Sequence, residues 1–522
     1  MSLTRTVTIN NLPDEVLLEA FDYYRQSFGD QLNSEGAWNN KNGWFKLAHV
    51  CQNWRCVVLA SSSRLQLRLF FSDNTPTRVA MLEYLSHLPI IVDYSRTIKT
   101  PSDQKRLISA LRYPERVCGI AIRGSLQYID KISGALDSPF PVLENLELHD
   151  IRGYLDPILP TSFSTSVQSL RHLLWSGSLS TILPLLSVTR ALVDLNLCVD
   201  TVVCKTRRTT LFMHLQRLPH LRNLQVYTVV YLTGLSVKKP PITTTSLTKL
   251  SCFRFRGSCA QAEWFVAGLV APSLQEFHIS VSEHSPPFHF PCLYMFIRDT
   301  GTIFFAARLA IFGWEVMTSM FSHPHSIDDQ PNKVVTIRTP FDVQLGPALS
   351  AMLCTIEDIF LYLDDPTARR RALLEKSKFF EEFHNVKVLR LHHDLSTEVA
   401  DMLQKSTMNP LPAQEPEAEP DATTPSGPPM NGNGSLFTSD IFPSLEKIMV
   451  YTRTQESSIG EDERAFALES FGPFATARRQ VGRPVKVLWS TDKELPRYFM
   501  TEPRRYVGAW HFTTDPRWYV GA

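Results

Sequence analysis

"VLENLELHD", residues Val142 to Asp150, contains the pattern that decides the fold of this chain. Its apolar residues are spaced as LxxLxL, and similar phrases return along most of the sequence. The first apolar residues of six copies are separated by 27, 22, 29, 26 and 27 residues. A seventh copy, at Val117 to Ile122, lies 26 residues before the first of these six. The six positions are Leu143, Leu170, Leu192, Leu221, Leu247 and Leu274.

This period is typical of a leucine-rich-repeat solenoid. Two apolar side chains of each short strand point inward, and a single repeat cannot bury them until a neighbour stacks against it. Between the phrases lie helical patterns, as in "TTLFMHLQRL" and "AEWFVAGLV". The sequence therefore predicts an α/β fold, a leucine-rich-repeat-like solenoid with a curved parallel sheet inside and helices outside. Later copies of the phrase begin near Ile356, Val386 and Leu445.

The residue between the two inward positions of each strand is expected to point out of the concave sheet. These positions carry no run of one charge, which suits recognition of a protein surface better than a polyanion. A merely solvated sheet face is the alternative at each single position. The candidate substrate-binding ladder is Glu147, Asn196, Gln225, His278, Phe360, Arg390 and Met449, and the same count adds Ala121, Leu174 and Ser251.

Two segments interrupt the repeat. Residues 286–340 lack the phrase except for a hint in "CLYMFIRDT", so insertions or irregular repeats are expected there. Residues 409–434 hold seven prolines, four acids and almost no large apolar group, which predicts a disordered linker because such a segment cannot offset its ordering entropy. "GRPVKVLWST" predicts a last strand, and the residues that follow it are expected to cap the open end of the sheet.

The composition argues against three classes of protein: nucleic-acid binders, membrane or secreted proteins, and disulfide-bonded proteins. Lysine plus arginine (53) nearly equals aspartate plus glutamate (52), so the net charge of +1 is not the footprint of a general nucleic-acid binder. The chain shows neither a signal peptide nor an apolar run long enough to cross a membrane. Nine scattered cysteines without a CxxC pair fit reduced thiols better than a disulfide frame. We expect an intracellular protein, cytoplasmic or nuclear, without nucleic-acid or membrane partners.

The N-terminal "LPDEVLLEAF", residues Leu12 to Phe21, predicts a short helix. Pro13 suits a first helical turn, and two acidic residues follow it at the positive end of the helix dipole. A polar stretch across 25–43 reads as a loop. "WFKLAHVCQNWRCVVLA", residues 44–60, then carries one helical stripe of apolar residues, so it predicts a second amphipathic helix. A helical hairpin that packs only on its own neighbour is the alternative.

The order of residues in these two segments resembles the F-box, the motif that docks on the Skp-type adaptor of cullin-RING ubiquitin ligases, and in particular F-box proteins of mushroom-forming fungi. The long internal loop is a departure from the motif, although loop length changes closure entropy only slowly. The resemblance implies a short helical F-box over 8–68, followed by a solenoid over 69–408, a linker over 409–435, and last repeats with a cap over 436–522. The adaptor-binding residues that it implies are Leu12, Pro13, Val16, Leu17, Phe21, Leu47, Val50, Cys51 and Trp54.

Motifs for catalysis or metal binding are absent from the sequence. It has no Walker loop, no GxGxxG after a strand, no GxSxG elbow and no HExxH. Adjacent residues of a strand point to opposite faces, so His392 and His393 are not expected to hold one ion. A Pro-His loop is expected at His323, His325, Asp328 and Asp329, and the pairs Cys198/Cys204 and Cys252/Cys259 have the wrong spacing for a zinc knuckle.

The function that the F-box resemblance implies is that of a substrate-recognition subunit of a cullin-RING ubiquitin ligase. It would need no cofactor, metal or catalytic residue of its own, since partner subunits perform the chemistry. A non-enzymatic leucine-rich-repeat scaffold or regulator without a ligase role is the main alternative. An uncharacterised enzyme is a third, and it would require titratable groups clustered in a cleft.

Overall fold

The computed structural model of the 522-residue chain describes nineteen segments of it. All statements about structure below concern these residues. They are 12–28, 44–65, 67–72, 80–94, 101–124, 132, 134–150, 159–200, 205–229, 244–281, 291–299, 304–312, 315–322, 334–340, 352–363, 380, 383–408, 441–452 and 461–491.

A sheet of sixteen strands forms the body of the protein, in the order β1-β2-β3-β4-β5-β6-β7-β9-β11-β14-β13-β12-β15-β16-β17-β18. A separate two-stranded sheet pairs β8 (Thr245–Ser246) with β10 (Leu269–Val270). The sixteen strands are β1 (Leu69–Ser72), β2 (Ile90–Tyr94), β3 (Val117–Gly124), β4 (Asn145–Asp150), β5 (His172–Gly177), β6 (Asp194–Asp200), β7 (Asn223–Val229), β9 (Cys252–Gly257), β11 (Glu276–Val281), β12 (Phe304–Phe312), β13 (Glu315–Ser322), β14 (Val334–Pro340), β15 (Asp358–Leu363), β16 (Val388–His392), β17 (Lys447–Thr452) and β18 (Lys486–Thr491).

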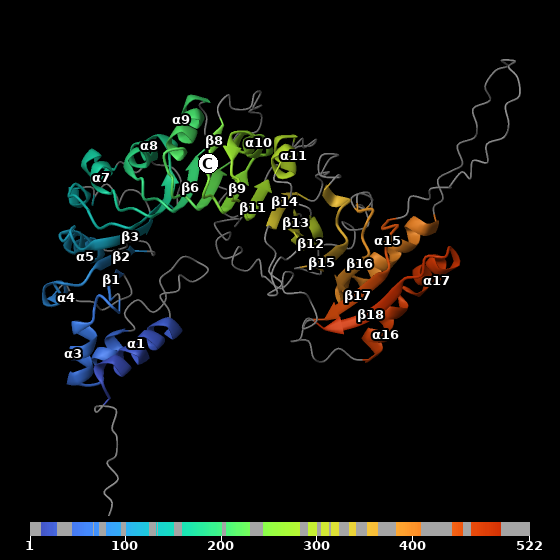
Figure 1. Ribbon diagram of the computed structural model, residues 1–522, viewed down its shortest axis with the longest axis horizontal. Coiled ribbons are helices and arrows are strands. Elements are labelled where there is room, and N and C mark those ends of the chain that lie inside the picture. Colours follow the sequence, from blue (N-terminus) through green and yellow to red (C-terminus); the bar gives the residue numbers. More distant parts are fainter. Residues whose placement is uncertain are drawn as a thin grey trace, which may run out of the picture.

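Helices alternate with the strands along most of the chain. Figure 1 shows them along the outer side of an arc whose inner side is the sheet. They are α1 (Asp14–Phe28), α2 (Trp44–Ala48), α3 (Gln52–Ala60), α4 (Ala80–Tyr84), α5 (Pro101–Leu111), α7 (Thr161–Ser166), α8 (Leu179–Val188), α9 (Lys205–Leu215), α10 (Cys259–Ala267), α11 (Pro291–Asp299), η3 (His393–Leu395), α15 (Ser396–Met408), α16 (Glu461–Glu469) and α17 (Gly472–Gln480).

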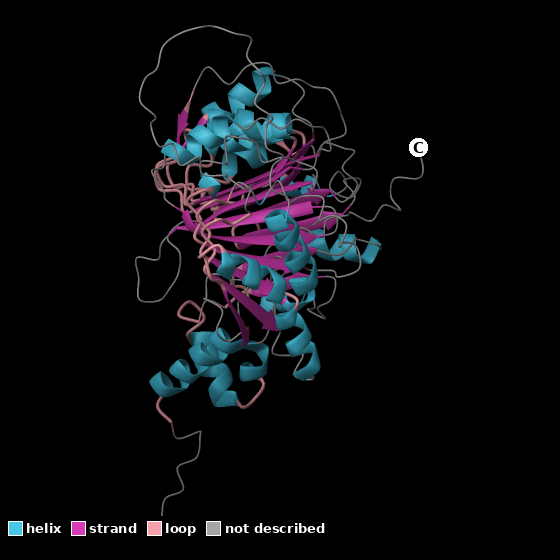
Figure 2. Cartoon of the chain, turned by 90° about the vertical axis from the view of Figure 1, so that its right-hand side faces the viewer, coloured by secondary structure: helices cyan, strands magenta, loops and turns pink. Residues whose placement is uncertain are grey.

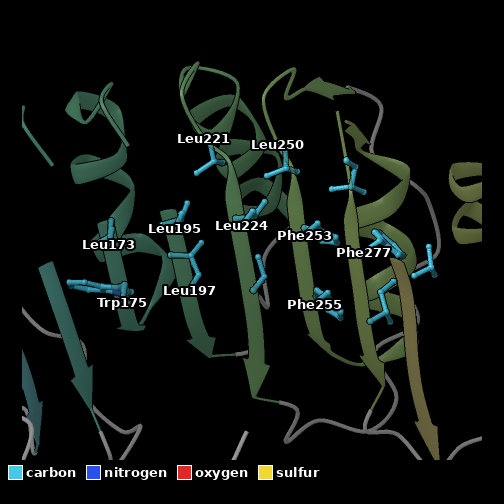
Figure 3. Packing of buried hydrophobic residues seen from close by; sticks show 14 of the residues in the cluster. Leu173, Trp175, Leu195, Leu197, Leu221, Leu224, Leu250, Phe253, Phe255 and Phe277 are labelled. Carbon is cyan, nitrogen blue, oxygen red and sulfur yellow. The ribbon is translucent and has the colours of Figure 1, made fainter. Parts of the chain in front are cut away.

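The core lies between the sheet and the outer helices. In β5, β6, β7 and β9 the apolar residues of the repeated phrase share one face, and Figure 3 shows them side by side on consecutive strands. Leu195, Leu224 and Phe253 are each no more than 1% exposed. Because every strand relies on its neighbours for this burial, one apolar cluster runs from Leu17 in α1 to Val485 before β18.

The strands that the repeated phrase predicts are confirmed. Each of the nine copies and the earlier copy in β3 forms a strand of the large sheet, and "VKVLWST" supplies the last one, β18. The stretches "TTLFMHLQRL" and "AEWFVAGLV" contribute to helices α9 and α10, as expected. Viewed from the end, in Figure 2, the strands follow one another along the arc. The result is an α/β architecture with a large parallel sheet, consistent with a leucine-rich-repeat-like solenoid.

The middle of the chain departs from the parallel repeat, in the region 286–340 where irregular repeats were expected. β13 runs antiparallel to both β12 and β14, and this meander lies in reverse order between β11 and β15. β14 pairs in parallel with β11, and β12 pairs in parallel with β15, so the ladder continues without a gap. "CLYMFIRDT", which hinted at a strand, forms most of helix α11. Its apolar residues recur at helical spacing, and Leu293 and Ile297 are buried.

The N-terminal region contains three helices rather than two. The stripe over 44–60 breaks after Ala48, and Cys51 caps the N-terminus of α3 by accepting a hydrogen bond from the Trp54 amide at 3.4 Å. The predicted loop over 25–43 is also too long, because α1 continues to Phe28. The remainder of that loop, 29–43, and the predicted linker, 409–435, lie outside the described residues.

Candidate functional site

Helix α1 starts at the proline that the sequence places before it. The Pro13 carbonyl accepts hydrogen bonds from the amides of Val16 and Leu17, each at 3.1 Å, so Pro13 belongs to the first turn. Asp14 and Glu15 follow in that turn, where negative charge stabilises the helix dipole. The local sequence therefore fixes both the start and the rotation of the helix.

Two apolar faces lie along α1. One is buried against the protein itself and consists of Leu17, Leu18 and Phe21, which are 1%, 7% and 1% exposed. The other is exposed and follows spacings of three, four and three residues, which places its members on one side of the helix. We call it the exposed stripe. Its members are Pro13, Val16, Ala20 and Tyr23.

The two helices that follow divide the remaining predicted adaptor-binding residues. Leu47 is buried, and Trp54 packs against Phe21 edge to face, with ring centroids 4.8 Å apart. Cys51 is occupied as the cap of α3. Val50, between α2 and α3, is 56% exposed. Leu12 is half-buried against the core.

Of the nine predicted adaptor-binding residues, the structure thus leaves few for an outside partner. Pro13, Val16 and Val50 are exposed, while Leu17, Phe21 and Leu47 hold the helices together. Sequence reasoning missed the rest of the exposed stripe. Ala20 and Tyr23 could have been found, because they continue the spacing that begins at Pro13.

The helices are also joined to the sheet. The Trp44 indole N–H donates to the carbonyl of Arg68 at 3.1 Å, one residue before β1. Arg64 lies 3.7 Å from Asp22 of α1, an exposed pair of small energetic value. Apolar residues of α1, α2 and α3 belong to the same core cluster as the strands. The N-terminal helices and the solenoid therefore form one packed unit.

A second candidate surface is the concave face of the sheet. The predicted ladder residues fall into one row that crosses all sixteen strands in register, which we call the central row. Its members are Ser72, Asp93, Ala121, Glu147, Leu174, Asn196, Gln225, Arg254, His278, Thr336, Ser319, Arg308, Phe360, Arg390, Met449 and Leu488.

One predicted member of the ladder is wrong. Arg254, rather than Ser251, pairs with Gln225 and His278 on the neighbouring strands. In this repeat the inward positions are Phe253 and Phe255, so the LxxLxL pattern starts at Leu250 and not at Leu247. Because phenylalanines stand where leucines were expected, the predicted start of this repeat lies three residues too early.

Exposure divides the central row into parts. From β4 to β9 all five members are half-exposed, and we call this part the open window: Glu147, Leu174, Asn196, Gln225 and Arg254. On the near side Asp93 and Ala121 are buried. On the far side His278, Phe360 and Met449 are 6%, 5% and 8% exposed. Leu488, at the β18 end of the row, is 41% exposed. The open window is therefore the continuous accessible part of this row among the strands in the middle of the sheet, and Leu488 is a separate exposed position at its end.

Charged groups beside the open window are held in place by neighbours. His172 and Asn223 both contact the carboxylate of Asp194 from the strands on either side. Burial would raise the pKa of Asp194, but these hydrogen bonds keep it below its usual value. On β7 the Tyr227 hydroxyl donates to Gln225 at 2.9 Å, and burial raises the pKa of Tyr227 to about 12. The window thus offers oriented polar groups.

A second ionic group closes the far side of the window. Glu276 lies 3.1 Å from Arg254 and 3.5 Å from the imidazole of His278. The hydrogen bond with His278, and then the charge of Arg254, lower the pKa of Glu276 to about 2, against the effect of burial. Burial itself lowers the pKa of His278, which favours its neutral form. The carboxylate of Glu276 is therefore ionised where it lies between Arg254 and His278.

Farther along, the concave face carries a satisfied buried network. Arg390 donates from Nε to both carboxylate oxygens of Asp358, at 2.8 and 3.0 Å, and from Nη1 to the Tyr451 hydroxyl at 2.7 Å. Phe360 packs edge to face on Tyr451, with ring centroids 6.3 Å apart. Predicted ladder residues Phe360, Arg390 and Met449 therefore belong to internal packing.

Reactive chemistry has little support among the described cysteines. Burial raises the pKa of the Cys252 thiol to about 12, and it also raises the pKa of Cys118. A protonated thiol is a poor nucleophile. Neither Cys252 nor Cys259 takes part in a disulfide bond. Cys204 and the group His323, His325, Asp328 and Asp329 lie outside the described residues.

One expectation about donor groups is wrong. His392 and His393 were expected on opposite faces of a strand, but β16 ends at His392 and the 3-10 turn η3 begins at His393. Strand alternation therefore stops between them, and their ring centroids lie 4.5 Å apart. Both imidazoles face the carboxylate of Asp394.

Comparison with known proteins identifies no family. No family model matches this chain, and no curated protein matches it. A solved structure that resembles it is described as the crystal structure of a TLR13-ssRNA13 complex, with 14% sequence identity and a TM-score of 0.27. The match covers 74% of this chain and 46% of that one, so it spans less than half of the length of the solved chain.

Across the part of the chain that the structure describes, no helix is long and apolar enough to cross a bilayer.

Proposed function

We propose that this protein is the substrate-recognition subunit of a cullin-RING ubiquitin ligase. Helices α1 to α3 act as an F-box that docks on a Skp-type adaptor, and through it on a cullin. The concave face of the solenoid binds the target protein. The protein works in the cytoplasm, the nucleus or both, and it requires neither nucleic acid nor membrane.

The observation that carries this proposal is the exposed stripe of α1. A helix that served only its own core would need one apolar face, which Leu17, Leu18 and Phe21 already supply. The second face, with Val16 46% and Tyr23 75% exposed, has the spacing of a helix that lies in a partner's groove. Val50, 56% exposed in the turn before α3, adds a further apolar contact point.

The mechanism that follows is tethering. Binding of a target beside a ubiquitin-conjugating enzyme raises the effective concentration of the target's lysines near the reactive thioester. The chain then needs no catalytic residue of its own. Its role is geometric, and the single packed unit formed by α1 to α3 and the sheet supports it, because a rigid connection fixes the position of the target.

The target is expected at the open window. Its five central-row residues mix charged, amide and apolar side chains, a composition suited to a protein surface. Arg254 at one end and Glu147 at the other give the window opposite charges at its two ends. A target segment with the reverse order of charges would be attracted and oriented along the row.

A binding experiment with the full-length chain tests the adaptor contact. Recombinant Skp-type adaptor is titrated against wild type and against a variant carrying Pro13→Ala and Val16→Ala. Loss of two interface anchors should weaken binding by about 2 kcal/mol or more. Met213→Ala is the matched control, because Met213 is 52% exposed on α9, away from the exposed stripe.

The rival function is a scaffold or regulator without a ligase role. Its support is the hydrogen bond from Trp44 to Arg68 and the shared core, which show that α1 to α3 also serve the solenoid. This rival predicts that wild type does not bind the adaptor at all. Equal binding by wild type and the double variant would likewise argue against docking through the exposed stripe.

A further inference from the structure

Three potential metal ligands converge at the carboxyl end of β16. His392 Nδ1 lies 3.1 Å from one carboxylate oxygen of Asp394, and His393 Nε2 lies 3.2 Å from the other. One donor atom from each of the three residues can be chosen so that all lie within 4.8 Å of one another. The group lies away from the open window and from the exposed stripe, so neither proposed contact uses it.

The backbone holds these donors in a fixed arrangement. Immediately after His392 the chain turns into η3, whose Leu395 is 1% exposed and anchors the turn in the core. The Ser396 hydroxyl donates to the carbonyl of His393 at 2.7 Å and closes the turn. The His392 side chain is only 5% exposed. A ligand set on such a rigid element loses little freedom when an ion binds.

Access to the group comes from the Asp394 side. The side chain of His393 is 19% exposed and that of Asp394 is 40% exposed, whereas His392 lies beneath them. An ion could therefore reach the three donors from solvent, and water could complete its coordination. Three protein ligands with an open position are common in zinc sites that are not purely structural.

The chemistry of the donors selects the class of ion. Two imidazoles with one carboxylate suit Zn²⁺, Co²⁺ or Ni²⁺, whereas Mg²⁺ and Ca²⁺ prefer sets made of oxygen alone. Bond lengths of about 2.0 to 2.2 Å place tetrahedral ligands roughly 3.3 Å from one another. The two nitrogen-to-oxygen distances, 3.1 and 3.2 Å, are close to this separation. These two contacts involve different oxygens of Asp394, and the three donor atoms span up to 4.8 Å, so an ion would draw the donors together as it replaces the hydrogen bonds.

We propose that His392, His393 and Asp394 form a binding site for a divalent transition-metal ion of the zinc type. The ion joins the end of β16 to the turn that leads into α15, and so it stabilises the last repeats.

Calorimetric titration of the chelator-treated full-length chain with ZnCl₂ tests the site. Asp394→Asn is the main variant, because its side chain is partly exposed and the change preserves its shape. We expect it, and His393→Gln, to weaken zinc binding about tenfold or more, since each removes one of three ligands. His172→Gln is the matched control: it alters a pair with Asp194 that contains only one imidazole.

A second readout depends on Trp489, whose ring centroid lies 6.5 Å from that of His393. Ni²⁺ in the site should quench the fluorescence of Trp489, and Trp489→Phe should remove this part of the signal without removing zinc binding. The proposal is overturned if wild type takes up no zinc. It is equally overturned if Asp394→Asn and His393→Gln bind zinc as tightly as wild type and the His172 control.

Discussion

Arg390 on β16 and Asp358 on β15 form an ion pair on the concave face in which both side chains are almost fully buried, at 13% and 12% exposed. In the register of the sheet Asp358 lies directly beside Val388, and Arg390 reaches it from two residues farther along β16. An ion pair in such a place fixes geometry more reliably than it adds stability.

Removal of one partner of this pair should therefore be costly. Asp358→Asn leaves Arg390 buried without its counter-charge, and we expect a loss of about 3 to 5 kcal/mol in the free energy of unfolding. Replacement of both partners, Asp358→Leu with Arg390→Met, should be less damaging than the single change. Urea unfolding followed by circular dichroism measures both, and a double variant less stable than Asp358→Asn would contradict the expectation.

The two faces of one strand should respond differently to truncation. Leu195 on β6 is 1% exposed, so Leu195→Ala should reduce the free energy of unfolding by about 2 to 5 kcal/mol. Its neighbour Asn196 lies in the open window, and Asn196→Ala should change stability by no more than about 0.5 kcal/mol. Urea midpoints compare the two. Similar losses for both would mean that the window is covered.

Gly257, at the end of β9, has no room for a side chain. A β-carbon there would lie 2.0 Å from Thr228 Oγ1 and 2.9 Å from Gln261 Oε1. Thr228 donates to Gln261 at 2.6 Å, and Gln261 also completes the capping box of α10 with Ser258. Gly257→Ala should break this arrangement and cost about 1 to 3 kcal/mol. Thermal unfolding checks it, with Gly134→Ala as control, since a β-carbon there meets nothing within 4 Å.

Acid should weaken the ionic group beside the window. The pKa of Glu276 is about 2 in the folded chain and near 4.5 when unfolded, so its contribution to stability is complete above pH 4.5 and disappears as the pH falls toward 2. Glu276→Gln should therefore lower the urea midpoint at pH 6 and have little effect near pH 2.5. Glu357→Gln is the control, because its pair with Lys387 is exposed. An equal effect of Glu276→Gln at both pH values would contradict the assignment.

The sequence predicts the regular repeats well because their physics is local. Each LxxLxL phrase specifies two inward positions and one outward position, and any neighbour with the same phrase completes the core. The repeat that contains Ser251 was assigned wrongly. Phe253 and Phe255 fill its inward positions as well as leucine does, so a count based on leucines placed the repeat three residues too early. An irregular region was expected over 286–340, but not the form of the meander, because the order of its strands is set by the pairings of β14 with β11 and of β12 with β15.

Side-chain roles were less predictable than strands. The F-box resemblance placed Leu17 and Val16 together in one docking motif, but only packing decides that Leu17 turns inward while Val16 stays exposed. Alternation along a strand misplaced His393 because it assumes that the strand continues, and β16 ends one residue earlier. Both errors concern the ends and the neighbours of elements, where tertiary contacts override local pattern.

The reversed meander also limits how this solenoid can change length. On either side of it, a strand with its helix is an interchangeable module that could be duplicated or lost while the sheet closes again. β12, β13 and β14 are not interchangeable, because β12 meets β15 and β14 meets β11. Loss of β12 or β14 would leave the next module facing β13, which runs in the opposite direction. The three strands of the meander can therefore be lost or gained only together, and variation in the number of repeats is expected on either side of them.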